Sequence, residues 1–212
     1  MKKLIALSLA AVMALSPVAC GGNNETTTTQ TPSSSTSAPE TTAPSTTAPS
    51  TTAPVVENPA SALEVLQKTW AAVAEEEKFF VGGGDYDNMV DGDAGVVLDT
   101  AYMTGTLRLP ETLAESVDNA AGLIHGMNLN SMTIGAYQVK DGTDLEAFAA
   151  ACKEGLASVQ WMCGFPEVQM VIAVGNVVVF GYGLTDNMTL IQTALTSVYA
   201  DAQILVNEPI EA

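Results

Sequence analysis

Apolar side chains recur at intervals of three and four residues in several segments after residue 57. This spacing places them on one face of an α-helix, so it predicts amphipathic helices. In the first segment, Leu63, Leu66 and Trp70 follow Asn58-Pro59, a pair typical of a helix start. The predicted helices cover residues 58–78, 98–106, 110–124, 143–163 and 186–198.

Four segments in the C-terminal half have the pattern of β-strands: residues 131–140, 168–174, 177–182 and 202–206. The second and third are joined by Gly175-Asn176, which is typical of a tight hairpin turn. From residue 131 onward the order is therefore strand, helix, strand, strand, helix, strand. We predict an α+β fold, in which a C-terminal βαββαβ (ferredoxin-like) antiparallel four-stranded sheet is preceded by two or three helices.

Right-handed crossovers in that topology place both C-terminal helices on one face of the sheet. The N-terminal helices then either cover the other face or flank one edge. If they do neither, the open apolar face marks a surface for a partner or for a second copy of the chain. The segment 81–97, rich in glycine and aspartate, is expected to be a long loop.

The first twenty residues have the pattern of a secretory signal peptide that ends at a cysteine. Lys2 and Lys3 precede an apolar run over residues 4–15, and Cys20 follows shortly after. The run is shorter than the roughly 20 residues that a membrane-spanning helix needs. We predict a lipoprotein signal over residues 1–19 and lipidation of Cys20. Pro17 departs from the lipoprotein pattern, and ordinary cleavage after Ala19 is the alternative.

The next segment consists almost entirely of Thr, Ser, Pro and Ala. Residues 20–56 include three copies of a five-residue repeat that ends in Thr-Thr-Ala-Pro, and they contain no large apolar side chain before Val55. Such a segment cannot offset the entropy of ordering by burying a core, so a disordered linker is predicted. Its hydroxyls are either glycosylated or bare. The remaining residues, 57–212, are long enough for a single α+β domain.

The chain carries 24 acidic and 7 basic residues, a formal net charge of −17. Loss of Lys2 and Lys3 with the signal peptide takes this charge to −19. So acidic a surface repels nucleic acid and anionic lipid headgroups. The expected contacts are with the membrane through the N-terminal lipid, and with an envelope protein or a small ligand.

Four aspartates of the 81–97 segment are the best candidates for metal ligands: Asp85, Asp87, Asp91 and Asp93. Clustered carboxylates on flexible backbone suit calcium, although the spacing does not match the EF-hand. The alternative is a solvated acidic loop. The single histidine, His125, has no nucleophile or carboxylate at a suitable spacing on the helix predicted there. We therefore predict no catalytic residue and no cofactor.

Two further features have competing interpretations. Trp161 and Phe165 belong to a dense group of large side chains, which either forms a binding surface or closes a helix against the core. Cys152 and Cys163 pair only if the chain turns back between them, because eleven residues of helix would separate them by about 16 Å. Two buried free thiols are the other outcome.

These segments together resemble small lipoproteins of Gram-positive bacteria that carry a domain of unknown function. The resemblance rests on residues 15–22 and 63–80 and on three motifs: Gly83-Gly84-Asp85-Tyr86, Tyr137-Gln138-Val139-Lys140-Asp141-Gly142 and Gln160-Trp161-Met162-Cys163-Gly164-Phe165-Pro166. It implies a location on the cell surface and no particular chemistry.

The sequence thus favours a non-catalytic lipoprotein of the cell envelope, extracytoplasmic and anchored to the membrane by lipid, that binds a ligand or a protein. The alternatives are an envelope hydrolase, or a calcium-binding module, that uses the acidic loop over residues 85–93.

The anchor is tested by growing producing cells with radioactive palmitate. We expect the label on a polypeptide that begins at Cys20, because lipid attachment accompanies removal of residues 1–19. An unlabelled polypeptide that still carries residues 1–19 would contradict this prediction.

Overall fold

The computed structural model describes residues 58–162 and 164–211 of the chain. The predicted signal peptide (residues 1–19), Cys20, the linker (residues 20–56) and Cys163 lie outside the described residues. Within the described residues, no helix is both long and apolar enough to cross a membrane.

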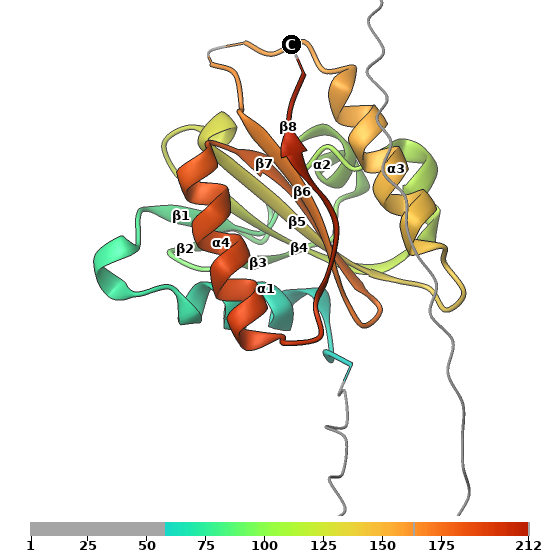
Figure 1. Ribbon diagram of the computed structural model, residues 1–212, viewed down its shortest axis with the longest axis horizontal. Helices are drawn as coiled ribbons and strands as arrows, with labels where there is room; N and C mark the ends of the chain where they lie inside the picture. Colours follow the sequence, from blue (N-terminus) through green and yellow to red (C-terminus); the bar gives the residue numbers. More distant parts are fainter. Residues whose placement is uncertain (1–57, 163, 212) are drawn as a thin grey trace, which may run out of the picture. The chain divides into compact units, whose positions relative to one another are not determined.

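The described residues form a single antiparallel sheet with helices on both faces (Figure 1). The strands lie in the order β2-β1-β4-β5-β7-β6-β8, and β3 also pairs with β4. The strands are β1 (Val81–Gly83), β2 (Val90–Asp91), β3 (Gly95–Val97), β4 (Val117–His125), β5 (Met132–Val139), β6 (Val168–Val174), β7 (Val177–Gly183) and β8 (Gln203–Pro209). The α-helices are α1 (Ala62–Ala72), α2 (Thr100–Gly105), α3 (Leu145–Ala157) and α4 (Thr185–Val198), and the 3₁₀ turns are η1 (Glu75–Glu77), η2 (Glu111–Ser116) and η3 (Leu129–Ser131).

Most of the predicted C-terminal elements are confirmed. The strands β5, β6, β7 and β8 and the helices α3 and α4 lie where the sequence pattern places them, although α3 ends at Ala157, before the predicted end at residue 163. Gly175-Asn176 forms the turn between β6 and β7. Asp144 caps the N-terminus of α3, and its side chain accepts a hydrogen bond from the backbone nitrogen of Ala147.

The prediction of a four-stranded ferredoxin-like sheet is wrong, because the sheet has eight strands. The last strand also lies at a different position from the one predicted. In the ferredoxin-like order β8 would pair with β5, but that edge of β5 is occupied by β4, and β8 pairs with β6 instead. The unit from β5 to β8 therefore extends an existing sheet in one direction.

This change of position moves one helix to the other face of the sheet. The connections from β5 to β6 and from β7 to β8 step across the sheet in the same direction, but they start from antiparallel strands. Two crossovers of the same hand then place their helices on opposite faces. Figure 1 shows the sheet between α4 and α3, and the expectation of both helices on one face is wrong.

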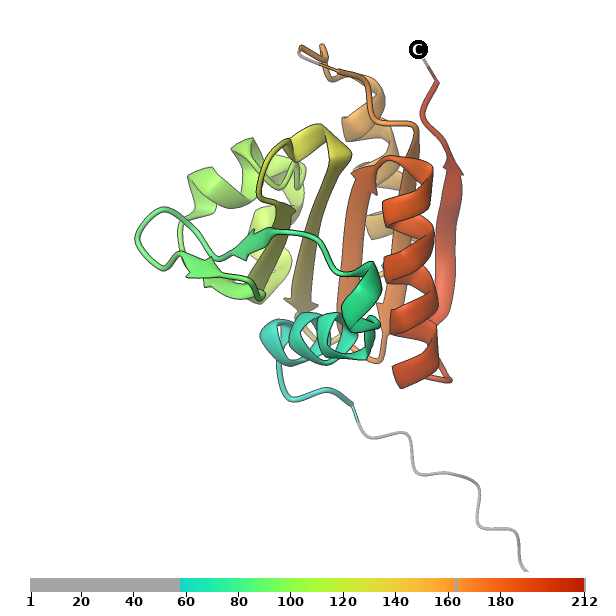
Figure 2. The same cartoon turned by 90° about the vertical axis from the view of Figure 1, so that its left-hand side faces the viewer.

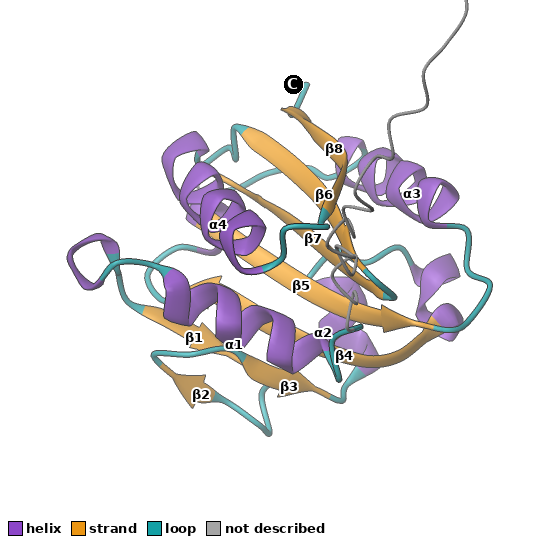
Figure 3. Ribbon diagram, turned by 60° about the horizontal axis from the view of Figure 1, so that its bottom comes forward, coloured by secondary structure: helices purple, strands orange, loops and turns teal. Residues whose placement is uncertain are grey.

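Two apolar cores result, one on each face of the sheet. On the first face, α1 and α4 cover Ile134, Ile172 and Val179, and α1 runs across the lower end of α4 (Figure 2). On the second face, α2, α3 and the segment around η2 cover Tyr137 and Phe180. Figure 3 shows α1 and α4 in front of the sheet, with α3 behind it. Both faces of the strands β5 to β7 are therefore covered.

The helix predicted over residues 110–124 is absent. A 3₁₀ turn, η2, occupies the first part, and the remainder is the strand β4, which pairs with β5 along most of its length. Ala121 and its cross-strand partner Ala136 are fully buried beneath α1. Their small side chains let α1 approach the sheet closely, so residues that favour a helix in isolation serve here as a packing surface.

The loop predicted over residues 81–97 instead contains three short strands. The strands β1 and β3 pair in succession with the same edge of β4. Where they meet, a β-carbon on Gly95 would lie 2.5 Å from the backbone nitrogen of Gly84, and a β-carbon on Gly83 would clash with the backbone of Gly95. Only glycine permits this approach.

The close approach of β1 and β3 can be tested by substituting Gly95→Ala. The added methyl group meets backbone that cannot move aside, so we expect the free energy of unfolding in urea to fall by about 3 kcal/mol or more. Gly105→Ala is the matched control, because a β-carbon on Gly105 meets no atom within 4 Å and alanine suits a helix. Equal free energies of unfolding for the two variants would contradict this close approach of the two backbones.

Candidate functional site

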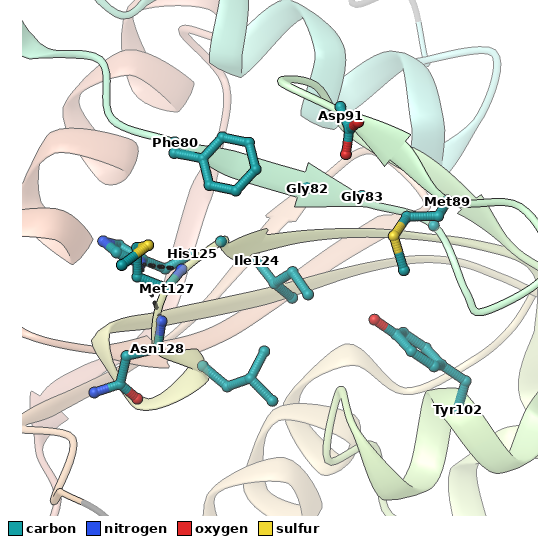
Figure 4. Close-up of a pocket in the computed structure, with 13 residues that line it drawn as sticks. Phe80, Gly82, Gly83, Met89, Asp91, Tyr102, Ile124, His125, Met127 and Asn128 are labelled. Carbon is teal, nitrogen blue, oxygen red and sulfur yellow. Dashed lines mark hydrogen bonds between the residues drawn. The ribbon is translucent and has the colours of Figure 1, made fainter.

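A pocket of about 240 Å³ opens on the second face of the sheet, beside α2. Its floor is formed by the backbone of β1 and by the end of β4, and the turn that follows β4 closes one side (Figure 4). The lining residues come from elements that the sequence analysis did not connect: Phe80, Gly82, Gly83, Gly84, Met89, Asp91, Tyr102, Ile124, His125, Gly126, Met127, Asn128 and Leu129.

The pocket exists because Gly82 has no side chain. Gly82 pairs with Asp91 on one side and with Ile124 on the other, so these three residues lie in one row across the sheet. Neighbouring side chains in such a row share a face of the sheet. A β-carbon on Gly82 would meet only the carbonyl oxygen of Val90, at 3.6 Å. The space between Asp91 and Ile124 is therefore open.

Tyr102 forms the wall of the pocket that belongs to α2. Tyr102 is only 6% exposed, and its hydroxyl makes no hydrogen bond within the described residues, but this oxygen is not among the buried unpartnered atoms and so reaches the solvent of the pocket. Figure 4 shows this hydroxyl directed into the pocket. Burial raises the pKa of Tyr102, and the nearby Tyr86 and Asp85 add to the rise. The hydroxyl stays protonated at neutral pH and is free to bond with a bound molecule.

The rim of the pocket is apolar and unusually exposed. Phe80 is 57% exposed, Met89 66% and Met127 82%. Leu129 is exposed beside them. Methionine side chains are flexible and polarisable, and they adapt to ligands of varied shape. An exposed apolar rim around a concave floor is typical of a binding site.

His125 lies at the end of the strand β4, and its ring has a structural role. Its Nδ1 accepts hydrogen bonds from the backbone nitrogens of Met127 and Asn128, at 3.1 and 3.3 Å. The ring stacks on Phe79 with a centroid separation of 5.0 Å. These contacts hold the turn that closes the pocket.

Asp85 is a buried carboxylate that organises the acidic segment. It is 2% exposed and accepts five hydrogen bonds, from the backbone nitrogens of Asp87, Asn88, Leu98 and Asp99 and from the side-chain amide of Asn88. Burial acts to raise the pKa of Asp85, but these hydrogen bonds outweigh it and lower the pKa from 3.8 to about 2. Both oxygens are committed to the backbone and not available as ligands.

The structure does not bring the four predicted calcium ligands together. Asp87 and Asp91 are exposed, and the Asp93 carboxylate accepts a hydrogen bond from the adjacent backbone nitrogen of Ala94. Across residues 58–162 and 164–211, no three His, Cys, Asp or Glu side chains are grouped as a metal site would require. Of the four, Asp91 lines the pocket.

Trp161 and Phe165 lie outside the pocket, on the loop between α3 and β6. The Trp161 ring packs on Tyr182 with a centroid separation of 5.1 Å, and Phe165 lies against Trp161 at 6.1 Å. The side chain of Asn130 donates hydrogen bonds to the carbonyl oxygens of Met162 and Gly164, which ties this loop to η3. Trp161 thus packs against the second core, and Phe165 remains partly exposed.

Cys152 is a buried free thiol on α3. Burial raises its pKa to about 12, so the reactive thiolate form is scarce at neutral pH. The residue packs among Tyr137, Phe148 and Leu156 and serves as part of the second core.

Sequence reasoning identified Asp91 as a candidate but missed the role of Gly82, Tyr102, Met89 and Met127. The run Gly82-Gly83-Gly84 was the available signal, because consecutive glycines mark close backbone approach or an open face. Comparison of the chain with protein-family models, curated proteins and solved structures found no match.

The role of Asp85 can be tested by substituting Asp85→Asn. The pKa is lower in the folded protein, so the charged carboxylate stabilises the fold by about 2 kcal/mol above about pH 4, and this stabilisation is lost as the pH falls towards 2. We expect the variant to be less stable at pH 7 by about 2–3 kcal/mol in urea unfolding. The difference should shrink as the pH falls from 4 to 2.

Asp87→Asn is the control for this experiment, because its exposed carboxylate is not the acceptor of these bonds. Its stability should stay within about 0.5 kcal/mol of the parent at pH 7. If Asp85→Asn behaved like the control, Asp85 would not organise the segment.

Proposed function

We propose that this chain is an extracytoplasmic binding module, held to the membrane by lipid on Cys20, whose pocket at Gly82 takes a small molecule with an apolar body. The N-terminal pattern of Lys2, Lys3, the apolar run and Cys20 supports the location. The pocket and its exposed rim support the binding.

The observation that carries this proposal is the Tyr102 hydroxyl. A hydroxyl that lies at the wall of a pocket and makes no bond within the protein is available to a bound molecule as donor and acceptor. Tyr102 is nearly buried, its hydroxyl has no partner among the described residues, and it points into the pocket. A bound molecule can bond with this hydroxyl in place of solvent and so be held in one orientation.

Binding is favoured over catalysis by what the candidate residues already do. His125 uses Nδ1 to hold the turn, and Asp85 uses both oxygens to hold the acidic segment. No serine, threonine or cysteine is among the residues that line the pocket. The lining therefore offers recognition groups rather than an activated nucleophile with its base.

The proposal is tested by labelling the methyl groups of the 9 methionines and adding 2-phenylethanol as a neutral apolar probe. We expect the NMR signals of Met89 and Met127 to shift as the probe is added. The signal of Met162 should not shift, because Met162 is exposed but lies outside the lining.

Gly82→Val fills the space between Asp91 and Ile124 and should weaken this binding at least about tenfold. Valine suits a strand and its β-carbon meets only one atom, so we expect the stability to change by less than about 1 kcal/mol. Gly105→Ala should bind like the parent. Uniform shifts of exposed methionines, or unchanged binding by Gly82→Val, would refute the proposal.

A further inference from the structure

We infer that the natural ligand of the Gly82 pocket is a small organic ammonium, whose cationic nitrogen pairs with Asp91. This inference rests on the proposed function and adds the chemical class of the ligand. It follows from the charges of the lining residues, from the position of Asp91 and from the groups that face it.

Asp91 is placed to meet a charge inside the pocket. It lies on the edge strand β2, directly across from Gly82, and Gly82 places no side chain between Asp91 and Ile124. Figure 4 shows the Asp91 carboxylate directed towards the open space above the pocket floor. Nothing from β1 shields it from a molecule that rests against Ile124.

No cation competes for this carboxylate from within the pocket. The lining residues include no lysine and no arginine, and Asp91 is the acidic residue among them. Lys78 lies close in sequence to Phe80, but it pairs with Glu75 and lies over the ring of Trp70, which belongs to the core of the opposite face. An ammonium group on the ligand would therefore supply the positive charge that the Asp91 carboxylate does not find among the lining residues.

The other lining groups suit a cation that carries an apolar body. The rings of Phe80 and Tyr102 offer faces that attract an organic cation, and the thioethers of Met89 and Met127 are polarisable. The Tyr102 hydroxyl can accept a hydrogen bond from an ammonium N–H. The net charge of −17 attracts cations from solution and repels carboxylates and phosphates.

The test compares three probes that share one apolar body: 2-phenylethylamine, 2-phenylethanol and phenylacetic acid. Each is titrated into the full chain at neutral pH and low salt, and its dissociation constant is measured by calorimetry. We expect the amine to bind about tenfold more tightly than the alcohol, and the acid more weakly than both. High salt should narrow the ratio between amine and alcohol.

Variants at Asp91 then assign the preference to one residue. Asp91→Asn should bring the amine down to the affinity of the alcohol and leave the alcohol unchanged. Asp91→Lys should reverse the order, so that the acid binds more tightly than the amine. Asp87→Asn, which removes an equal charge outside the pocket, should keep the preference of the parent.

The outcomes separate this inference from the proposed function. Equal binding of amine and alcohol, or a preference for the amine that survives in both Asp91 variants, overturns the charge assignment and leaves the pocket in place. Failure of all three probes to bind the parent overturns both. Thermal unfolding of each variant verifies that it is folded before its affinity is compared.

Discussion

The close approach of two backbones along one edge of β4 is the constraint on which the structure of the site depends. The strands β1 and β3 share that edge, and they meet where Gly83 and Gly84 lie against Gly95. A side chain where these backbones meet would force the two strands apart. The strand β2 would then lose its partner, and Asp91 would lose its place beside Gly82.

The run Gly82-Gly83-Gly84, which permits this close approach of the backbones, also opens the pocket. A β-carbon on Gly83 would clash with the backbone of Gly95, and one on Gly84 with the backbone of Asn88. Gly82 instead faces open space between Asp91 and Ile124. Asp85, immediately after the run, accepts hydrogen bonds from Leu98 and Asp99 and so fixes the segment that leads into α2. Since α2 carries Tyr102, one short stretch of sequence sets both the floor and a wall of the pocket.

Most elements of the C-terminal half were predictable because each has a clear pattern in its own stretch of sequence. The β-branched runs around Gly175-Asn176 are a strong local signal for a hairpin, and the hairpin is found as predicted. The strand β4 was not predictable in this way. Its alanines favour a helix in isolation, and they form a strand because Ala121 pairs with Ala136 beneath α1.

Missing that strand had two consequences for the predicted fold and site. Without β4, the free edge of β5 seemed available to β8, so the ferredoxin-like order and two helices on one face followed. With no strand predicted at β4, the strands β1 and β3 had no pairing partner in the predicted fold. Residues 81–97 were therefore predicted to be a loop, and Asp91 was assigned to an acidic cluster. Long-range pairing decides both features, and no local pattern encodes it.

The most direct test is the backbone NMR spectrum of residues 117–125. We expect carbon chemical shifts typical of a β-strand, with through-space contacts between Ala121 and Ala136 and between Gly82 and Ile124. Helical shifts over these residues, with contacts between residues three positions apart in the chain, would contradict this expectation and would remove the row of residues that forms the pocket.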